Sequence, residues 1–106
     1  MKLEDKFSED DKFYYLNGHN GYWIRKGFGN GKVFAYFLEH EGEEISIEKI
    51  WEISGWKSTK SNMERYLKPY INNWSPYNIT AVDNEKGLHY KMKRKSEKEL
   101  AELKAS

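Results

Sequence analysis

One segment in the middle of the chain gathers residue types that bind phosphate groups and the edges of nucleobases. From position 57 to position 68 it carries four basic residues against one acid, a net charge of +3, with hydroxyl and amide side chains among them. Lysine and arginine neutralise phosphates, arginine and asparagine pair with purine edges, and serine can reach either group. The candidate binding residues of this segment are Lys57, Ser58, Lys60, Ser61, Asn62, Arg65 and Lys68.

A second basic segment lies between positions 83 and 95, where five basic residues stand against two acids, again a net charge of +3. Its candidates are Lys86, at the tip of a predicted turn, and His89 and Lys91 on the strand that follows. These side chains would contact the phosphate backbone or a minor groove. The run Lys93-Arg94-Lys95 is either a flexible extension that grips phosphates or a solubilising junction.

Other kinds of chemistry are not indicated by the sequence. The chain has no cysteine, and its three histidines are not spaced as metal ligands, so we predict no metal site and no cofactor. Five glutamates surround His40 between positions 39 and 48, but they straddle a predicted helix end and an exposed turn. Because the sequence has no nucleophile elbow or phosphate-binding loop and implies no apolar pocket there, we predict that the protein is not an enzyme.

Length and composition indicate one folded domain. A chain of 106 residues with 16% aromatic residues can bury one modest core, and it has no apolar run long enough to span a bilayer. We therefore expect a cytoplasmic protein with no membrane partner. We divide it into an acidic, loosely ordered N-terminus (1–11, net charge −3), a folded domain (12–93), and a basic junction with a short C-terminal helix (94–106).

Two hairpins are predicted from aromatic or alternating runs bounded by turn residues. The N-terminal hairpin has a loop rich in glycine and asparagine, and the glycines that follow it are expected to form a turn. The C-terminal hairpin has a turn that contains one glycine. The predicted ranges are strands 13–16 and 22–26, turn 27–31, and then strands 77–82 and 88–92 around turn 83–87.

Helices with one apolar face each are predicted between the hairpins and at the end of the chain. The first spans 32–40, and the second follows Ser46 as its cap and ends at Gly55. A short final helix begins at a capping box, Ser96–Glu99, and carries two leucines on one side. The buried stripe of the second helix is predicted to contain Ile47, Ile50 and Trp51.

The third predicted helix, 58–72, contains the first basic segment. Either Ser58 caps it, or Ser61 does so in a capping box with Glu64. Pro69 should kink this helix or end it one turn early, because proline has no amide hydrogen to donate. The apolar side of the helix, which we expect in the core, consists of Met63, Leu67, Tyr70 and Trp74.

The order hairpin, helix, helix, turn, helix, hairpin is the order of a winged helix-turn-helix. From Phe13 to Met92 the chain resembles the winged-helix domains of transcription regulators, and most of all the output domains of response-regulator-type transcription factors. The stretch "LEHEGEEISIEKIWE" is similar to the end of that family's first helix, its glycine turn and its second helix, and "ITAVDNEKGLHYKM" is similar to its wing. The resemblance implies an α+β fold with a three-helix core, an N-terminal hairpin and a C-terminal β-hairpin wing.

The resemblance also implies binding to double-stranded DNA, either sequence-specific or structure-directed. The third helix (58–72) would enter the major groove as the recognition helix, and the basic wing (77–92) would contact the flank. Such a protein would be a transcription regulator or the DNA-reading module of a larger system. The alternative is a winged-helix protein–protein interaction module that binds a protein partner or a second copy through acidic and aromatic surfaces, without binding DNA.

Overall fold

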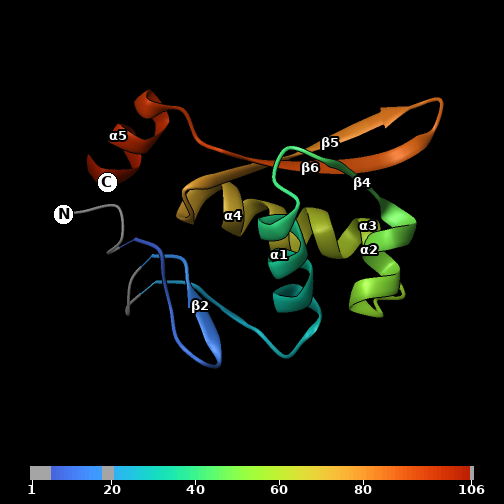
Figure 1. Cartoon of the computed structure of the whole chain (residues 1–106), viewed down its shortest axis with the longest axis horizontal. Helices are drawn as coiled ribbons and strands as arrows, with labels where there is room; N and C mark the ends of the chain where they lie inside the picture. Colours follow the sequence, from blue (N-terminus) through green and yellow to red (C-terminus); the bar gives the residue numbers. More distant parts are fainter. Residues whose placement is uncertain (1–5, 18–20, 106) are drawn as a thin grey trace.

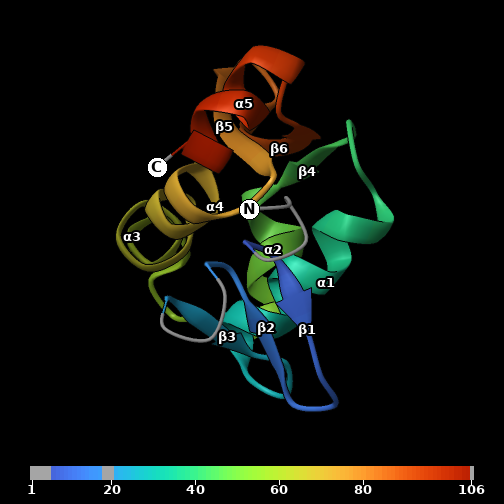
Figure 2. The same ribbon diagram turned by 90° about the vertical axis from the view of Figure 1, so that its left-hand side faces the viewer.

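A layer of helices separates two small antiparallel sheets in the computed structural model, which describes residues 6–17 and 21–105. Figure 1 shows the chain with its longest axis horizontal, and Figure 2 shows the helices between the N-terminal sheet and the C-terminal sheet. The elements are β1 (Ser8–Glu9), β2 (Phe13–Tyr15), β3 (Trp23–Arg25), α1 (Gly29–Glu39), β4 (Glu44–Ser46), α2 (Ile47–Ser54), α3 (Thr59–Asn62), η2 (Met63–Leu67), α4 (Lys68–Trp74), β5 (Tyr77–Asn84), β6 (Gly87–Arg94) and α5 (Glu97–Ala105).

The predicted N-terminal hairpin is confirmed, and a third strand extends it. Strands β2 and β3 pair with Tyr14 opposite Ile24, and β1 adds to the other edge of β2. The chain is therefore ordered well before residue 12, whereas residues 1–5 and 18–20 lie outside the described residues. The acidic composition of this region was misleading, because Asp10 builds the turn into β2. Its carboxylate accepts the backbone N–H groups of Lys12 and Phe13, both at 2.7 Å.

Helix α1 begins three residues earlier than predicted, within the glycine-rich stretch that was expected to be a turn. These glycines allow close packing. A side chain at Gly31 would meet the backbone oxygen of Arg25 at 2.1 Å, and one at Gly29 would meet the indole nitrogen of Trp56 at 2.3 Å. The absence of a β-carbon thus lets the start of α1 lie directly against the end of β3 and the indole ring.

The predicted caps of α2 are confirmed. The Ser46 hydroxyl accepts the backbone N–H of Lys49 at 3.1 Å, and Gly55 ends the helix with φ of 72°. The prediction that Trp51 lies in the buried stripe is wrong, since its side chain is 53% exposed. The stripe instead follows a three-residue spacing, with Ile50 fully buried and Ile53 packed at the edge of the core.

The chain remains helical from residue 59 to residue 74, and we call this segment (α3, η2 and α4) the central helix. It begins after Ser58, but neither predicted serine cap forms, because Ser58 makes no capping bond and Ser61 lies inside the helix. Of the two outcomes expected at Pro69, an early end of the helix is wrong, whereas a local change of helical geometry is present directly before the proline. A π-helical turn precedes the proline, in which the Lys68 N–H donates to the carbonyl of Met63. This wider turn carries the helical path past Pro69, which has no N–H of its own.

The π turn also changes which side of the central helix is buried. Met63 and Leu67 are buried as predicted, but the next core residue is Ile71 rather than Tyr70 or Trp74. The reason is that a π turn adds one residue to the helical repeat, so the apolar face advances by one position. Tyr70 and Trp74 move to the flank, where both rings lie 4.9 Å from the ring of Tyr22.

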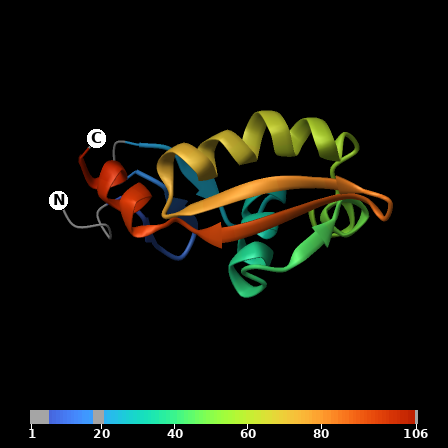
Figure 3. The same ribbon diagram turned by 90° about the horizontal axis from the view of Figure 1, so that it is seen from above.

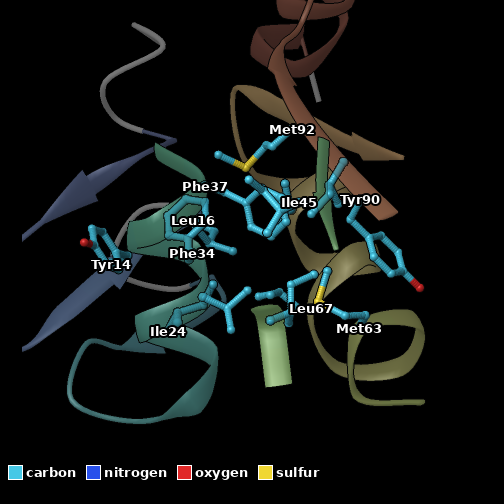
Figure 4. Close-up of a cluster of buried hydrophobic side chains, with 14 residues drawn as sticks. Tyr14, Leu16, Ile24, Phe34, Phe37, Ile45, Met63, Leu67, Tyr90 and Met92 are labelled. Atoms are coloured by element: carbon cyan, nitrogen blue, oxygen red, sulfur yellow. The ribbon is translucent and has the colours of Figure 1, made fainter. Parts of the chain in front are cut away.

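The C-terminal hairpin is confirmed and is longer than predicted. Eight residues of β5 pair with eight of β6 around the two-residue connection Glu85-Lys86, and Gly87 follows with φ of 101°. Strand β4, which the sequence did not indicate, pairs with the other edge of β6, so the sheet order is β4-β6-β5. Figure 4 shows side chains of this sheet meeting those of α1 and the central helix in the core. Among these buried residues are Phe34, Phe37, Ile45, Met63, Leu67, Tyr90 and Met92.

The predicted capping box of the last helix is confirmed by reciprocal bonds between Ser96 and Glu99, of 3.1 Å and 3.2 Å. The basic run before it is neither a flexible extension nor a simple junction. Lys93 and Arg94 belong to β6, and the amine of Lys95 turns inward. It donates to the carbonyls of Ser75 and Tyr77 at 2.7 Å and 2.6 Å, and to that of Ile71 at 3.4 Å. A cation at the C-terminal end of α4 also interacts favourably with the negative end of the helix dipole.

Substitution of Leu67 by alanine tests the anchoring of the central helix. Leu67 is fully buried, so Leu67→Ala should lower the free energy of unfolding by about 2–5 kcal/mol through lost burial and a residual cavity. The neighbouring Tyr66 is 51% exposed, and Tyr66→Ala should cost about 1 kcal/mol or less. Urea denaturation followed by circular dichroism measures both. Equal losses would contradict this orientation of the helix.

The environment of Lys95 predicts a pH dependence of stability. Burial lowers the pKa of Lys95 from 10.5 to about 8, and the Glu99 carboxylate opposes this shift. Between those values the unfolded chain holds a proton that the folded chain has lost, so the free energy of unfolding should rise with pH across this window. Below about pH 8 both states are protonated, and the contribution is constant.

The measurement compares urea unfolding of the native chain and of Lys95→Met from neutral pH to about pH 9.5, a range that lies below most tyrosine ionisation. The native chain should gain stability relative to Lys95→Met as pH rises. Lys98→Met is the matched control, since Lys98 is an exposed residue of α5, and its curve should run parallel to that of the native chain. A pH-independent difference between the native chain and Lys95→Met would refute the assignment.

Candidate nucleic-acid interface

The outward face of the central helix begins with exposed polar and basic side chains. Burial of Thr59, Met63 and Leu67 fixes the inner face of the helix. Residues half a helical turn away must then point to solvent, and Ser61 and Arg65 do so one turn apart. The exposed candidates at this end are Lys57, Ser58, Lys60, Ser61 and Arg65.

The basic side chains at this end of the central helix are free to meet an anion. Within the described part of the chain, Lys57, Lys60 and Arg65 form no ion pair. Lys68 differs, since its amine lies 3.3 Å from the Glu64 carboxylate and its charge is partly neutralised. The unpaired positive charge is therefore concentrated in the first turns of the helix.

Glu64 faces the C-terminal sheet and joins it to the central helix. Its carboxylate accepts the hydroxyl of Tyr90 at 3.0 Å in addition to the ion pair with Lys68. Burial, together with this hydrogen bond to a carboxylate, raises the pKa of Tyr90 well above its ordinary value. The hydroxyl therefore stays a neutral donor over the physiological range, and its hydrogen bond to Glu64 joins the helix to the sheet.

Asn62 lies on the opposite flank of the helix. Its amide donates to the carbonyl of Ser58 at 2.9 Å, and its side chain lines a cavity together with Tyr66 and Tyr70. Asn62 is thus directed away from the outward face that carries Arg65. The predicted base-contacting residues Asn62 and Arg65 therefore lie on different sides of the helix.

The three candidate residues of the C-terminal hairpin differ in their exposure to solvent. Lys86 is exposed in the connection between β5 and β6, beside the acids Asp83 and Glu85. His89 is partly buried, and its ring nitrogen lies 3.1 Å from the carbonyl of Gly87. Lys91 is partly buried at a position in register with Glu44 on one side. Of the three, only Lys86 is fully open to solvent.

Strand alternation places His89 and Lys91 on the far side of the sheet from the central helix. Their neighbours Tyr90 and Met92 are buried toward that helix, and successive side chains of a strand point to opposite faces. The ten predicted residues therefore do not form one surface. Figures 1 and 3 show the start of α3 and the β5–β6 connection at the same end of the molecule, which leaves Lys86 as the hairpin residue on that end.

A cavity that the sequence did not reveal lies on the Asn62 flank, between β3 and the central helix. It has a volume of about 400 Å³ and is lined largely by aromatic and amide side chains. A partial signal was present, because Asn62, Tyr66 and Tyr70 recur at four-residue intervals and so share one side of a helix. The lining residues from β3, which include Trp23, come from about forty positions earlier, and no local pattern links them.

Other functional sites receive little support from the described residues. His40 and Glu43 lie 2.8 Å apart, but on an exposed turn. Within residues 6–17 and 21–105, no group of three or more histidine, aspartate or glutamate side chains could hold a metal, and His19 falls outside this part. No helix in the same part is both long and apolar enough to cross a membrane.

Comparison with protein-family models, curated proteins and solved structures gives no match. What the chain does must therefore be argued from its own geometry.

The contact of Glu64 with the sheet predicts a measurable contribution to stability. Glu64→Ala removes the partner of both Tyr90 and Lys68, and should lower the free energy of unfolding by about 1–3 kcal/mol. Glu52 pairs with Lys49 at 3.7 Å in an exposed position, so Glu52→Ala should cost about 0.5 kcal/mol or less. Chemical denaturation compares the two variants, and equal effects would show that Glu64 does not join helix and sheet.

Proposed function

We propose that this protein binds double-stranded DNA through the outward face of the central helix. One observation carries the proposal: three cations without ion-pair partners among the described residues surround the first turns of a helix whose opposite face is buried. An α-helix fits the major groove, where arginine can pair with guanine. Arg65 and Ser61 would contact bases, and Lys57 and Lys60 would neutralise phosphates.

The connection between α2 and α3 supports a helix-turn-helix within this proposal. The two helices are separated by the four residues 55–58, and the first of them is Gly55 in the left-handed conformation. A three- to four-residue turn that contains glycine is typical of the motif. This turn brings Lys57 to the start of α3, so the turn itself would lie over a phosphate strand.

The hairpin beside the central helix supports a winged-helix arrangement. Its connection lies at the same end of the molecule as the start of α3, and Lys86 there would reach a flanking phosphate (Figure 3). His89 and Lys91 have no part in this surface, and Lys68 contributes less because Glu64 offsets its charge. The proposed role is that of a transcription regulator or the DNA-reading module of a larger system.

A second candidate function, a protein-interaction module, is favoured by the exposed aromatic side chains. Isolated exposed aromatics are common, but a contiguous group of them often marks a binding surface, and four of those named next line two adjoining hollows. Those most exposed are Tyr22, Trp23, Phe28, Trp51 and Tyr66. Such a module would bind its partner without any dependence on Arg65 or Lys60, which separates it from the first candidate.

Fluorescence anisotropy with a labelled duplex at two salt concentrations tests DNA binding. Affinity should fall as salt rises, because each neutralised phosphate releases counterions. Arg65→Ala should weaken binding by about tenfold, within the range for loss of one arginine–base contact. Lys60→Ala should instead reduce the salt slope by about one, the signature of a lost phosphate contact.

The control variant is Lys98→Ala, which removes an exposed lysine of α5 at the opposite end of the long axis from the hairpin connection (Figure 1). It keeps the net charge equal to that of Lys60→Ala, so a purely nonspecific charge effect would appear in both. No binding at low salt would refute DNA binding. Identical curves for Arg65→Ala and the native chain would refute the proposed face.

A further inference from the structure

Exposed aromatic rings stand around the cavity between β3 and the central helix. Trp23 of β3 is 57% exposed and Tyr66 of η2 is 51% exposed, and both line its volume of about 400 Å³. Tyr22 and Tyr70 form a further part of the wall and lie 4.9 Å apart. Volumes of this size are typical of small-ligand sites, which are mostly apolar with a few placed polar groups.

The polar groups that line this cavity are the side-chain amides of Asn30 in α1 and Asn62 in α3. Asn62 donates one amide hydrogen to the carbonyl of Ser58, and Asn30 donates one to that of Tyr66 at 3.5 Å. In the described part of the chain neither amide oxygen accepts a hydrogen bond, and each amide has a second hydrogen. Each of these two amides thus offers the cavity a hydrogen-bond acceptor and a donor beside the aromatic rings.

Among the described residues, no charged side chain lines the cavity itself. The hollow continues along β3 into a second one of about 390 Å³, which shares Trp23 and Asn30 with the first. Its only charged lining residue among those described is Arg25, whose guanidinium lies 4.5 Å from the centre of the Phe28 ring. This charge distribution suits a planar ring that carries a phosphate.

We propose that the cavity binds a single unpaired nucleobase, with adenine as its simplest fit. The ring would stack on Tyr66 or Trp23, and the amides of Asn62 and Asn30 would meet its amino group and ring nitrogens, as asparagine meets adenine elsewhere. The attached phosphate would lie toward Arg25 in the adjoining hollow. A hydrocarbon side chain of a protein partner fits less well, because it would bury both amides without partners.

This inference rests on the proposed DNA binding, because the cavity lies on the flank of the same helix. The base would be one displaced from a duplex bound at the outward face of that helix. The base could also come from a free nucleotide, whose chemistry is the same. The two sources are separated by experiment.

The first arm titrates adenosine 5′-monophosphate into isotopically labelled protein and follows the amide signals by NMR. The side-chain amides of Asn30 and Asn62 should shift. The second arm measures anisotropy with two duplexes of one sequence, one fully paired and one with a single unpaired adenine. The native chain should prefer the unpaired adenine by about fivefold or more, the lower range for one base–aromatic stack.

Trp23→Ala should abolish that preference and leave the affinity for the fully paired duplex unchanged, because Trp23 lies outside the proposed groove-facing surface. Tyr66→Ala provides a second route to the same result if Trp23→Ala folds poorly. Trp51→Ala is the matched control, since Trp51 is 53% exposed on α2 outside both hollows. It should behave as the native chain.

Each outcome bears on one proposal. Equal affinity for the two duplexes, with no amide shift from the nucleotide, would overturn the nucleobase site while leaving DNA binding intact. Nucleotide shifts without a duplex preference would support the site and identify free nucleotide as its source. If neither duplex binds, the proposed DNA binding fails, and the nucleotide titration alone then decides whether the cavity takes a base.

Discussion

The burial of one side of the central helix is the interaction on which the rest of the structure depends. Met63, Leu67 and Ile71 belong to one core with residues of α1 and of the C-terminal hairpin. Neither small sheet has enough apolar surface to be stable alone, and both contribute buried residues to this one core. The same burial leaves Ser61 and Arg65 facing water, so core formation and presentation of the candidate interface are two results of one packing arrangement.

The π turn before Pro69 decides how the flanks of this helix are used. A regular helix would direct Tyr70 and Trp74 into the core, as their spacing suggests. The extra residue in the turn gives that place to Ile71 and brings the two aromatic rings against Tyr22. One wall of the cavity is formed in this way. π turns are often found at functional sites, and here the turn coincides with the segment that carries Arg65 and Tyr66.

Local signals in the sequence predicted local structure well. The hairpins, the caps of α2 and the capping box of α5 each depend on residues a few positions apart, and all are present. The serine caps predicted for the central helix are the local exception, because that helix already begins at Thr59 and Ser58 makes no capping bond. The strand β4 and the two-sided arrangement of β6 depend on pairing between segments more than forty residues apart, which no local pattern encodes. Grouping His89 and Lys91 with Arg65 failed for this reason. The cavity was missed because its walls come from distant segments. The choice between an early end and a distortion of the helix at Pro69 could not be made from the sequence, because it depends on the turn before the proline.

Lys95 makes the end of the central helix and the end of the hairpin a single cooperative unit. Its amine bonds to carbonyls 24, 20 and 18 residues earlier, so these three hydrogen bonds form only when the end of β6 is in place. The last turn of α4 therefore cannot fray without exposing the amine and releasing the strand that carries it. Motions that open this end of the molecule must involve helix and hairpin together, whereas the basic start of α3 lies outside this unit.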